Sequence, residues 1–182
     1  MTDKKKFIIG SRGSKLSLAY STHVKSLLIE SNSQFNESSI DIKIIKTSGD
    51  IFKNKRISDI GGKGVFCKQI EDELLDSKIN LAVHSLKDLP TVMTKGLCVN
   101  ALVKRNDPRD AFLSYSNKSF NELKPQSRIG TSSFRRHAQI KLLRDDLMTI
   151  PMRGNIDTRI KKLKNHEYDA IVLSLAGIQM LN

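Results

Sequence analysis

The sequence predicts an α/β fold made of two small lobes, because strand-like and helix-like segments alternate in the same order twice along the chain. In the first half, apolar segments at 7–9, 40–46 and 79–84 are separated by helical patterns over 15–30 and 65–76. This β-α-β-α-β order is typical of parallel strands joined by crossover helices. We therefore expect a parallel sheet in the first lobe.

The second half repeats this order after the polar segment KRNDPRD at 104–110, which we interpret as a boundary. Beyond it we expect a strand near Ile129, a helix over 134–143, a strand over 148–150, a helix over 156–163 and a strand over 170–173. One more strand is expected before the boundary, in LCVNALV at 97–103. The predicted domains are therefore 1–103 and 104–182.

The spacing of apolar residues justifies the elements of the first half. Over 15–30 the apolar residues recur at helical spacing: Leu16, Ala19, Tyr20, Val24, Leu27 and Leu28. Alternating Ile40, Ile42 and Ile44 predict a strand with one buried face. The helix over 65–76 carries an apolar stripe of Phe66, Ile70 and Leu74, and the strand at 79–84 is apolar up to Val83.

Composition limits the classes of protein to which the chain can belong. With 182 residues and 38% hydrophobic content, the chain can bury a core. It contains no run of about 18 apolar residues, and MTDKKKFIIG is too short to be a secretory signal, so we expect a cytoplasmic protein that does not bind a membrane. The two cysteines, Cys67 and Cys98, lack CxxC spacing, which predicts neither a disulfide nor a metal site; both are expected in the core.

The charge predicts an anionic partner. The chain carries 31 Lys+Arg against 19 Asp+Glu, a net charge of +12. It has no Trp, three Tyr and seven Phe, and no basic stretch is interleaved with aromatic residues as in proteins that bind single-stranded nucleic acid. We therefore expect no nucleic acid partner, although a binder whose affinity falls steeply with salt stays an alternative.

Polar segments follow the expected strands: GSRGS, TSGD, HSLKD, GTSSFRR, PMRGN and SLAG. In open α/β sheets, ligands bind at the carboxyl ends of the strands, where helix N-termini also present free N–H groups. We therefore expect these segments to face one cleft between the lobes. Their basic and hydroxyl residues predict a receptor for a ligand with several carboxylates or phosphates; the alternative is that each arginine pairs with a surface acid. GSRGSK lacks the GxGxxG and GxxxxGK[ST] spacings of nucleotide-binding loops.

Two acids belong to the same segments, Asp88 in HSLKD and Asp50 in TSGD. Nearby cations favour an ionised carboxylate. Such a group could stabilise a developing cation, hold a protonated nitrogen or transfer protons during a reaction. The alternative for Asp88 is a structural ion pair with Lys87 or Arg12. His84 is expected only to end the strand.

Eight blocks of the sequence resemble the porphobilinogen deaminase (hydroxymethylbilane synthase) family. In chain order they are IIGSRGSKLSLA, KTSGD, GGKGVFCKQIEDELL, LAVHSLKDLPT, KRNDPRDAF, IGTSSFRRHAQI, RGNIDTRIKKL and YDAIVLSLAGI. The resemblance implies a cytoplasmic, monomeric transferase of tetrapyrrole (haem) biosynthesis. Such an enzyme condenses four porphobilinogen molecules into hydroxymethylbilane and releases ammonia. It also implies two periplasmic-binding-protein-like (type II) lobes around a cleft, with a smaller third domain.

The resemblance further implies the roles of individual residues. Asp88 is the catalytic acid group, whereas Asp50 stays a candidate only from its position in TSGD. Substrate and cofactor binding is expected at Arg12, Ser14, Lys63, Ser85, Lys87, Thr131, Ser132, Ser133, Arg135, Arg136, Arg153, Gly154 and Arg159. The sequence departs from the family pattern at Asp59, where many members have lysine, and at Met180, where arginine is usual.

The family's cofactor is dipyrromethane, and the cysteine that carries it belongs to the third domain. Neither Cys67 nor Cys98 matches that cysteine. We therefore expect these 182 residues alone to be inactive or nearly so, or to be one piece of a longer protein. The competing hypothesis from another class is a non-catalytic, two-lobed protein that binds polycarboxylates.

Overall fold

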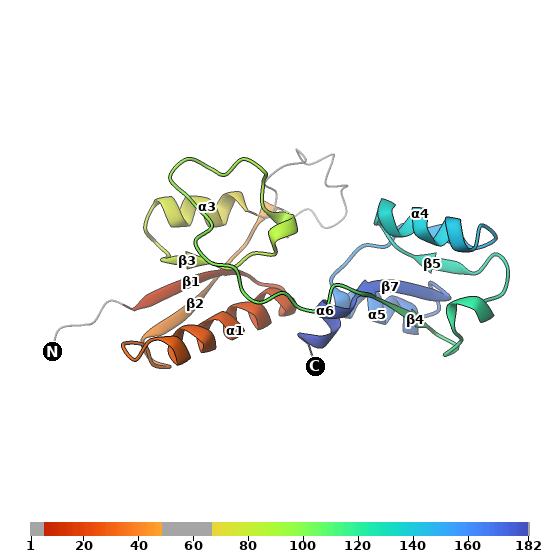
Figure 1. Ribbon diagram of the computed structural model, residues 1–182, viewed down its shortest axis with the longest axis horizontal. Coiled ribbons are helices and arrows are strands. Elements are labelled where there is room, and N and C mark those ends of the chain that lie inside the picture. The colour runs from red at the N-terminus through yellow and green to blue at the C-terminus, as the bar shows by residue number, and fades with distance from the viewer. Residues whose placement is uncertain (1–5, 49–66, 182) are drawn as a thin grey trace. The chain divides into compact units, whose positions relative to one another are not determined.

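The computed structural model describes residues 6–48 and 67–181, which form two compact units, Met1–Lys104 and Arg105–Asn182. Each unit contains one sheet covered by helices (Figure 1). The chain is therefore an α/β protein, as its sequence predicts. Among the described residues, no helix has both the length and the apolar character that a membrane crossing requires.

The sheet of the first unit has the order β2-β1-β3, and both pairings are parallel. Its elements are β1 (Phe7–Arg12), α1 (Lys15–Ser31), β2 (Ile40–Ile45), α3 (Lys68–Leu75), β3 (Leu81–Ala82) and the 3-10 turn η2 (Leu86–Asp88). The predicted β-α-β-α-β order with parallel strands is confirmed. The strand predicted over 79–84 is shorter, because only two of its residues pair with β1.

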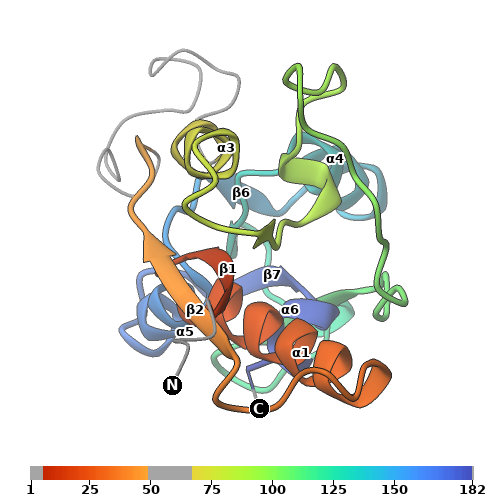
Figure 2. The same cartoon turned by 90° about the vertical axis from the view of Figure 1, so that its left-hand side faces the viewer.

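The helices α1 and α3 lie on opposite sides of this sheet (Figures 1 and 2). Under α3, Ile70 packs with Ile45 and Ile79 in one buried cluster, which Ile8 of β1 joins. Ile9 is fully buried and points to the other face, since side chains alternate along a strand. Ile70 and Leu74 of the predicted apolar stripe thus anchor α3 to the sheet, whereas Phe66 lies outside the described residues.

The second unit has a four-stranded sheet of order β4-β7-β5-β6. Its elements are β4 (Asp110–Ser114), η3 (Phe120–Glu122), β5 (Arg128–Gly130), α4 (Phe134–Leu143), β6 (Met148–Ile150), α5 (Ile156–Lys164), β7 (Ala170–Ser174) and α6 (Leu175–Gln179). Strands β5, β6 and β7 are parallel, whereas β4 runs antiparallel to β7. Ile140 of α4 joins the cluster on one face, and Leu163 of α5 joins the cluster on the other.

Two expectations for the segment before and after residue 104 are wrong. Residues 97–103 form no strand, and Leu102 is 76% exposed. A strand needs a neighbour for its backbone N–H and C=O groups, and within the described residues of this unit only β1, β2 and β3 form a ladder. Cys98 is consequently exposed and not in the core, whereas Cys67 is buried as predicted. The polar segment at 104–110 also ends in β4, a strand that the sequence did not predict.

Candidate functional site

In the first unit, two polar loops leave the same edge of the sheet. β1 and β3 are parallel and paired at Gly10 and Ala82, and Val83 extends this pairing by donating its N–H to the Gly10 carbonyl over 3.4 Å. The ends of both strands therefore deliver Arg12 and the segment from His84 to Asp88 to one edge.

Ser14, which the sequence assigns to anion binding, starts helix α1. Its Oγ accepts the N–H of Ser17 over 3.2 Å and lies 2.8 Å from the Ser17 hydroxyl. An N-cap of this kind satisfies one of the free N–H groups of the first turn, and the remaining N–H groups favour an anion. Ser14 thus orients a helix N-terminus that lies directly after Arg12.

The candidate acid, Asp88, ends the short turn η2. Its N–H bonds to the Ser85 carbonyl over 2.9 Å, and the whole run from Ser85 to Asp88 is exposed. Among the described residues, no ion pair joins Asp88 to Lys87, which is one of the two partners that the structural alternative names. The carboxylate is thus accessible to a ligand.

The side chains of Cys67 and His84 lie beside this turn. Buried Cys67 donates its thiol hydrogen to the Asp88 carbonyl, with 3.1 Å between Sγ and O, and its Sγ lies 3.9 Å from Nδ1 of His84. Burial, with the charges of Glu71 and Asp88, raises the pKa of Cys67 to about 11. Burial lowers the pKa of His84 against the opposing effect of Asp88. Both groups are therefore neutral near pH 7.

In the second unit, three loops meet at one edge because β5, β6 and β7 are parallel. Ser132, after β5, donates its Oγ–H to the Met152 carbonyl over 2.7 Å and accepts the Met152 N–H over 2.9 Å. Thr131 accepts the Ser133 N–H, and Ser133 caps helix α4 by accepting the Arg136 N–H. The hydroxyl groups of the TSS sequence therefore shape the loops and orient the N-terminus of α4.

Arginines crowd this edge. The pKa of Arg159 is lowered, first by burial and then by the positive charges of Arg136 and Arg153. Arg159 donates its Nε–H to the Gly154 carbonyl over 2.8 Å, and Gly154 has a φ of +115°, a conformation that residues with a Cβ rarely adopt. Repulsion among three guanidinium groups is relieved by anions. The donor set thus fits a ligand with several carboxylates.

An acid that the sequence analysis did not identify, Asp110, lies among these arginines. Its carboxylate bonds to Arg136 through two oxygens, with distances of 2.6 and 3.1 Å, and lies 3.4 Å from Arg135. The sequence feature that could have identified Asp110 is its position in DPRDAF, directly before an apolar run. A strand was not predicted there, so Asp110 was not assigned to a sheet edge.

Two predicted site residues, Lys63 and Asp50, lie outside the described residues. So does Asp59, where the sequence departs from the family pattern. Among the residues that are described, no group of three or more His, Cys, Asp or Glu side chains is placed to hold a metal ion.

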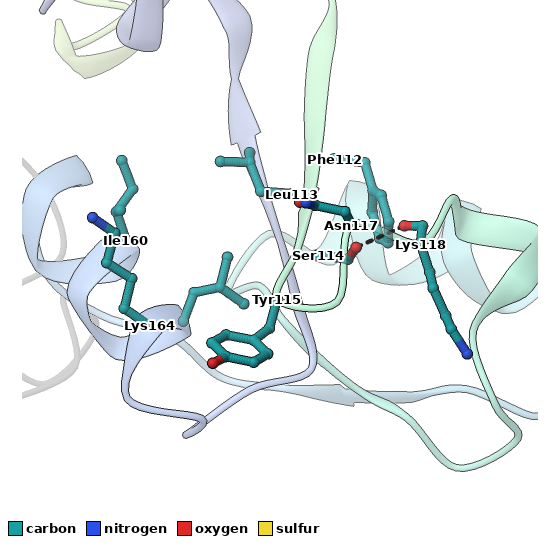
Figure 3. Close-up of a pocket in the computed structure, with 9 residues that line it drawn as sticks. Phe112, Leu113, Ser114, Tyr115, Asn117, Lys118, Ile160 and Lys164 are labelled. Atoms are coloured by element: carbon teal, nitrogen blue, oxygen red, sulfur yellow. Dashed lines mark hydrogen bonds between the residues drawn. The ribbon is translucent and has the colours of Figure 1, made fainter.

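A cavity of about 500 Å³ in the second unit is separate from this edge. Figure 3 shows Leu113 and Tyr115 on one side and Ile160 and Lys164 on the other. The cavity lies beside Ser114, the last residue of β4. Ser114 is opposite Ala170, the first residue of β7, so the cavity is at the edge of the sheet where the parallel strands begin. None of the predicted site residues lines it.

Comparison with known proteins decides the family. The family model described as "Porphobilinogen deaminase, dipyromethane cofactor binding domain" matches residues 7–182. The chain belongs to the porphobilinogen deaminase family. The resemblance found in the eight sequence blocks is thereby confirmed.

Longer relatives carry the same name. Porphobilinogen deaminase of Syntrophomonas wolfei is 48% identical over 173 residues, which are 95% of this chain and 56% of the relative. The protein of that name from Sulfurimonas denitrificans is 46% identical over 98% of this chain and 56% of its own length. The one from Ehrlichia chaffeensis is 48% identical over 96% of this chain and 57% of its own length. This member of the deaminase family thus spans little more than half the length of these relatives.

Proposed function

We propose that this chain supplies the substrate-binding and acid–base groups of a porphobilinogen deaminase, which condenses four porphobilinogen molecules into hydroxymethylbilane with loss of ammonia. The observation that carries the proposal is the exposed Asp88 carboxylate at a sheet edge that also holds Arg12 and the N-terminus of α1. Such an edge combines one acid with groups that attract carboxylates.

The binding role falls to the two loop systems at the strand ends. Porphobilinogen carries an acetate and a propionate group, and guanidinium groups match carboxylates in a planar, bidentate geometry. We assign carboxylate binding in the second unit to Arg135, Arg136, Arg153 and Arg159, with Thr131, Ser132, Ser133 and Gly154 shaping their loops. In the first unit, Arg12, Ser14, Ser85 and Lys87 have this role, and Lys63 and Asp50 stay expectations.

The same arginines suit the cofactor of the family, because a dipyrromethane also carries carboxylates, which guanidinium groups bind. When bound, the dipyrromethane supplies the pyrrole end to which the growing chain is joined. The residues of this chain that would hold it are Arg135, Arg136, Arg153 and Arg159. They bind and orient its acid groups.

The chemical role falls to Asp88. Loss of ammonia from porphobilinogen requires a proton on the leaving nitrogen and leaves a positively charged pyrrole. A carboxyl group beside that nitrogen can transfer the proton, and its carboxylate form stabilises the cation that develops. Since His84 and Cys67 are neutral beneath the turn, they do not compete with the substrate for the Asp88 charge.

We further propose that residues 1–103 and 104–182 are two type II periplasmic-binding-protein-like lobes, and that the substrate binds in the cleft between them. The protein is proposed to act as a cytoplasmic monomer. The family pattern and the strand-end positions of the basic residues support this arrangement.

The test is Asp88→Asn in the protein that contains this chain, with porphobilinogen as substrate. We expect turnover, measured as ammonia released and as uroporphyrin formed after cyclisation and oxidation, to fall by about 100-fold or more, while porphobilinogen still binds. Asp76→Asn is the matched control, since Asp76 forms an exposed ion pair with Lys78 in the same unit. Unchanged turnover in Asp88→Asn would contradict the role of Asp88, whereas a wild type that binds porphobilinogen without releasing ammonia would favour the non-catalytic polycarboxylate receptor.

A further inference from the structure

Asp110 lies at the ligand-facing edge of the second sheet although it begins a strand. β4 runs antiparallel to β7, and Asp110 is opposite Ser174, the last residue of β7. The amino end of an antiparallel strand therefore shares an edge with the carboxyl ends of β5, β6 and β7. This topology brings one acid to the loops that carry the arginines.

The Asp110 carboxylate fixes the guanidinium of Arg136 through a bidentate pair. Arg136 Nη2 is 2.6 Å from Oδ1 and Nε is 3.1 Å from Oδ2, while Nη1 donates to the Val172 carbonyl over 3.1 Å. The two side chains are only 15% and 25% exposed. A guanidinium has five N–H donors, so the three bonds that Arg136 makes within the described residues leave two donors for a ligand.

The need for such a restraint comes from the charges around it. Arg136 and Arg153 both act on Arg159, whose pKa they lower, and Arg135 lies 3.4 Å from the same Asp110 carboxylate. The hydrogen bond from Arg136 lowers the pKa of Asp110, so this carboxyl is ionised at neutral pH. A long side chain without this partner would turn away from its cationic neighbours and gain rotamer freedom.

We propose that Asp110 is a positioning residue that holds Arg136 in the arginine cluster and thereby raises the affinity of the second unit for carboxylates. This role rests on the proposed function. The negative charge of Asp110 opposes the approach of an anion, but it occupies one side of the Arg136 fork and leaves the remaining donors in a fixed orientation. Preorganisation outweighs the charge because a donor displaced by about 1 Å loses most of its contribution.

The test compares carboxylate binding by the wild type and by Asp110→Asn, which keeps the size of the side chain but removes its charge. Isothermal titration is run with porphobilinogen and, separately, with citrate, whose three carboxylates probe the arginines alone. We expect Asp110→Asn to weaken binding of both by about tenfold. Asp107→Asn is the matched control. Asp107 lies three residues before Asp110 and pairs with exposed Arg109, and the loss of its charge is expected to leave both affinities unchanged.

A double-mutant cycle distinguishes positioning from a general effect on folding. If Asp110 acts through Arg136, Asp110→Asn costs no further affinity in a chain that already carries Arg136→Gln. Circular dichroism establishes that each variant is folded. Should Asp110→Asn fail to fold, Asp110→Glu keeps the charge on a longer side chain and is expected to lose affinity by a smaller factor.

The outcomes separate this proposal from the proposed function. Equal or tighter citrate binding by folded Asp110→Asn, or losses that add in the cycle, overturns the positioning role. Citrate binding that depends on Asp110 while porphobilinogen fails to bind supports the positioning role and contradicts the proposed function. Failure of the wild type to bind either compound overturns both.

Discussion

The thiol of Cys67, at the start of α3, donates a hydrogen bond to the backbone oxygen of Asp88, 21 residues away. Cys67 is fully buried and Asp88 is exposed, so the bond joins the core of the first unit to the turn that carries the candidate acid. The pKa of Cys67, raised to about 11 by burial and nearby carboxylates, keeps the thiol protonated and able to donate. This contact thus supports the turn without adding a charge beside Asp88.

The two cysteines are predicted to differ sharply in reactivity. A thiol that is buried and protonated reacts slowly, because the thiolate is the nucleophile, whereas Cys98 is exposed. We expect the folded chain to show one rapidly reacting thiol with Ellman's reagent at pH 8, and a second only after urea is added.

Cys98→Ser is the control for this assignment. It should abolish the rapid reaction and leave the thiol that reacts only after urea is added. A rapid phase that survives in Cys98→Ser would show that Cys67 is accessible and that the α3 contact opens readily.

Ser132 is predicted to stabilise the second unit by joining the loops after β5 and β6. Ser132→Ala removes both its bonds to the Met152 backbone and leaves those two groups to find water. We expect the free energy of unfolding in urea to fall by about 1 to 2 kcal/mol. Ser26→Ala, which removes one exposed hydroxyl from α1, should change it little; equal effects of the two substitutions would refute a linking role for Ser132.

Elements bounded by polar segments were predictable from the sequence. Helix α4 and strand β6 have the predicted bounds, because the polar residues that flank them are a local property. The parallel direction of the strands in the first sheet was also predictable, since connections through helices favour parallel neighbours.

Features that depend on distant partners were not predictable. The apolar run over 97–103 resembles a strand, but no ladder forms for it within the described residues. Strand β4 was missed for the opposite reason: its first residue, Asp110, looks like part of a polar linker, and only its pairing with β7 makes it a strand.

The same distinction holds for the candidate site. That basic residues follow the strands was visible in the sequence, because strand ends are marked by local composition. The pairing of Asp110 with Arg136 could not be predicted. The bonds of this pair depend on which atoms the folded backbone brings within about 3 Å.

The Asp110–Arg136 pair is predicted to make stability depend on pH in the acid range. Bonding to Arg136 lowers the pKa of Asp110 below its ordinary value of 3.8. A carboxyl whose pKa is lower in the folded than in the unfolded state contributes stability above the unfolded value, and this contribution disappears as the pH falls through the folded value. We therefore expect the difference in unfolding free energy between wild type and Asp110→Asn to be constant from pH 7 to 5 and to shrink below pH 3.8.

Urea unfolding at a series of pH values measures this difference, and subtraction of the variant removes the contribution of the other acids with lowered pKa values, Asp107, Glu122 and Asp146. A difference that stays constant down to the lowest pH at which the second unit is folded would contradict the pairing.

Gly154 is predicted to be intolerant of a side chain, with consequences for Arg159. Its φ of +115° is strained for alanine, and a Cβ would lie 2.7 Å from Cγ2 of Thr158, in the first turn of α5. We expect Gly154→Ala to lower the free energy of unfolding by about 1 to 3 kcal/mol. It should also weaken citrate binding, since the Gly154 carbonyl accepts the Nε–H of Arg159.

Thr158→Ala separates the two causes of this loss. It removes the Cγ2 atom but leaves the backbone strain, so the double variant should recover only part of the stability that Gly154→Ala loses, while Thr158→Ala alone should have a small effect. Full recovery would assign the whole cost to the contact with Thr158. Wild-type stability and citrate affinity in Gly154→Ala would show that the loop relaxes without moving Arg159, and that the conformation of Gly154 does not set the position of this arginine.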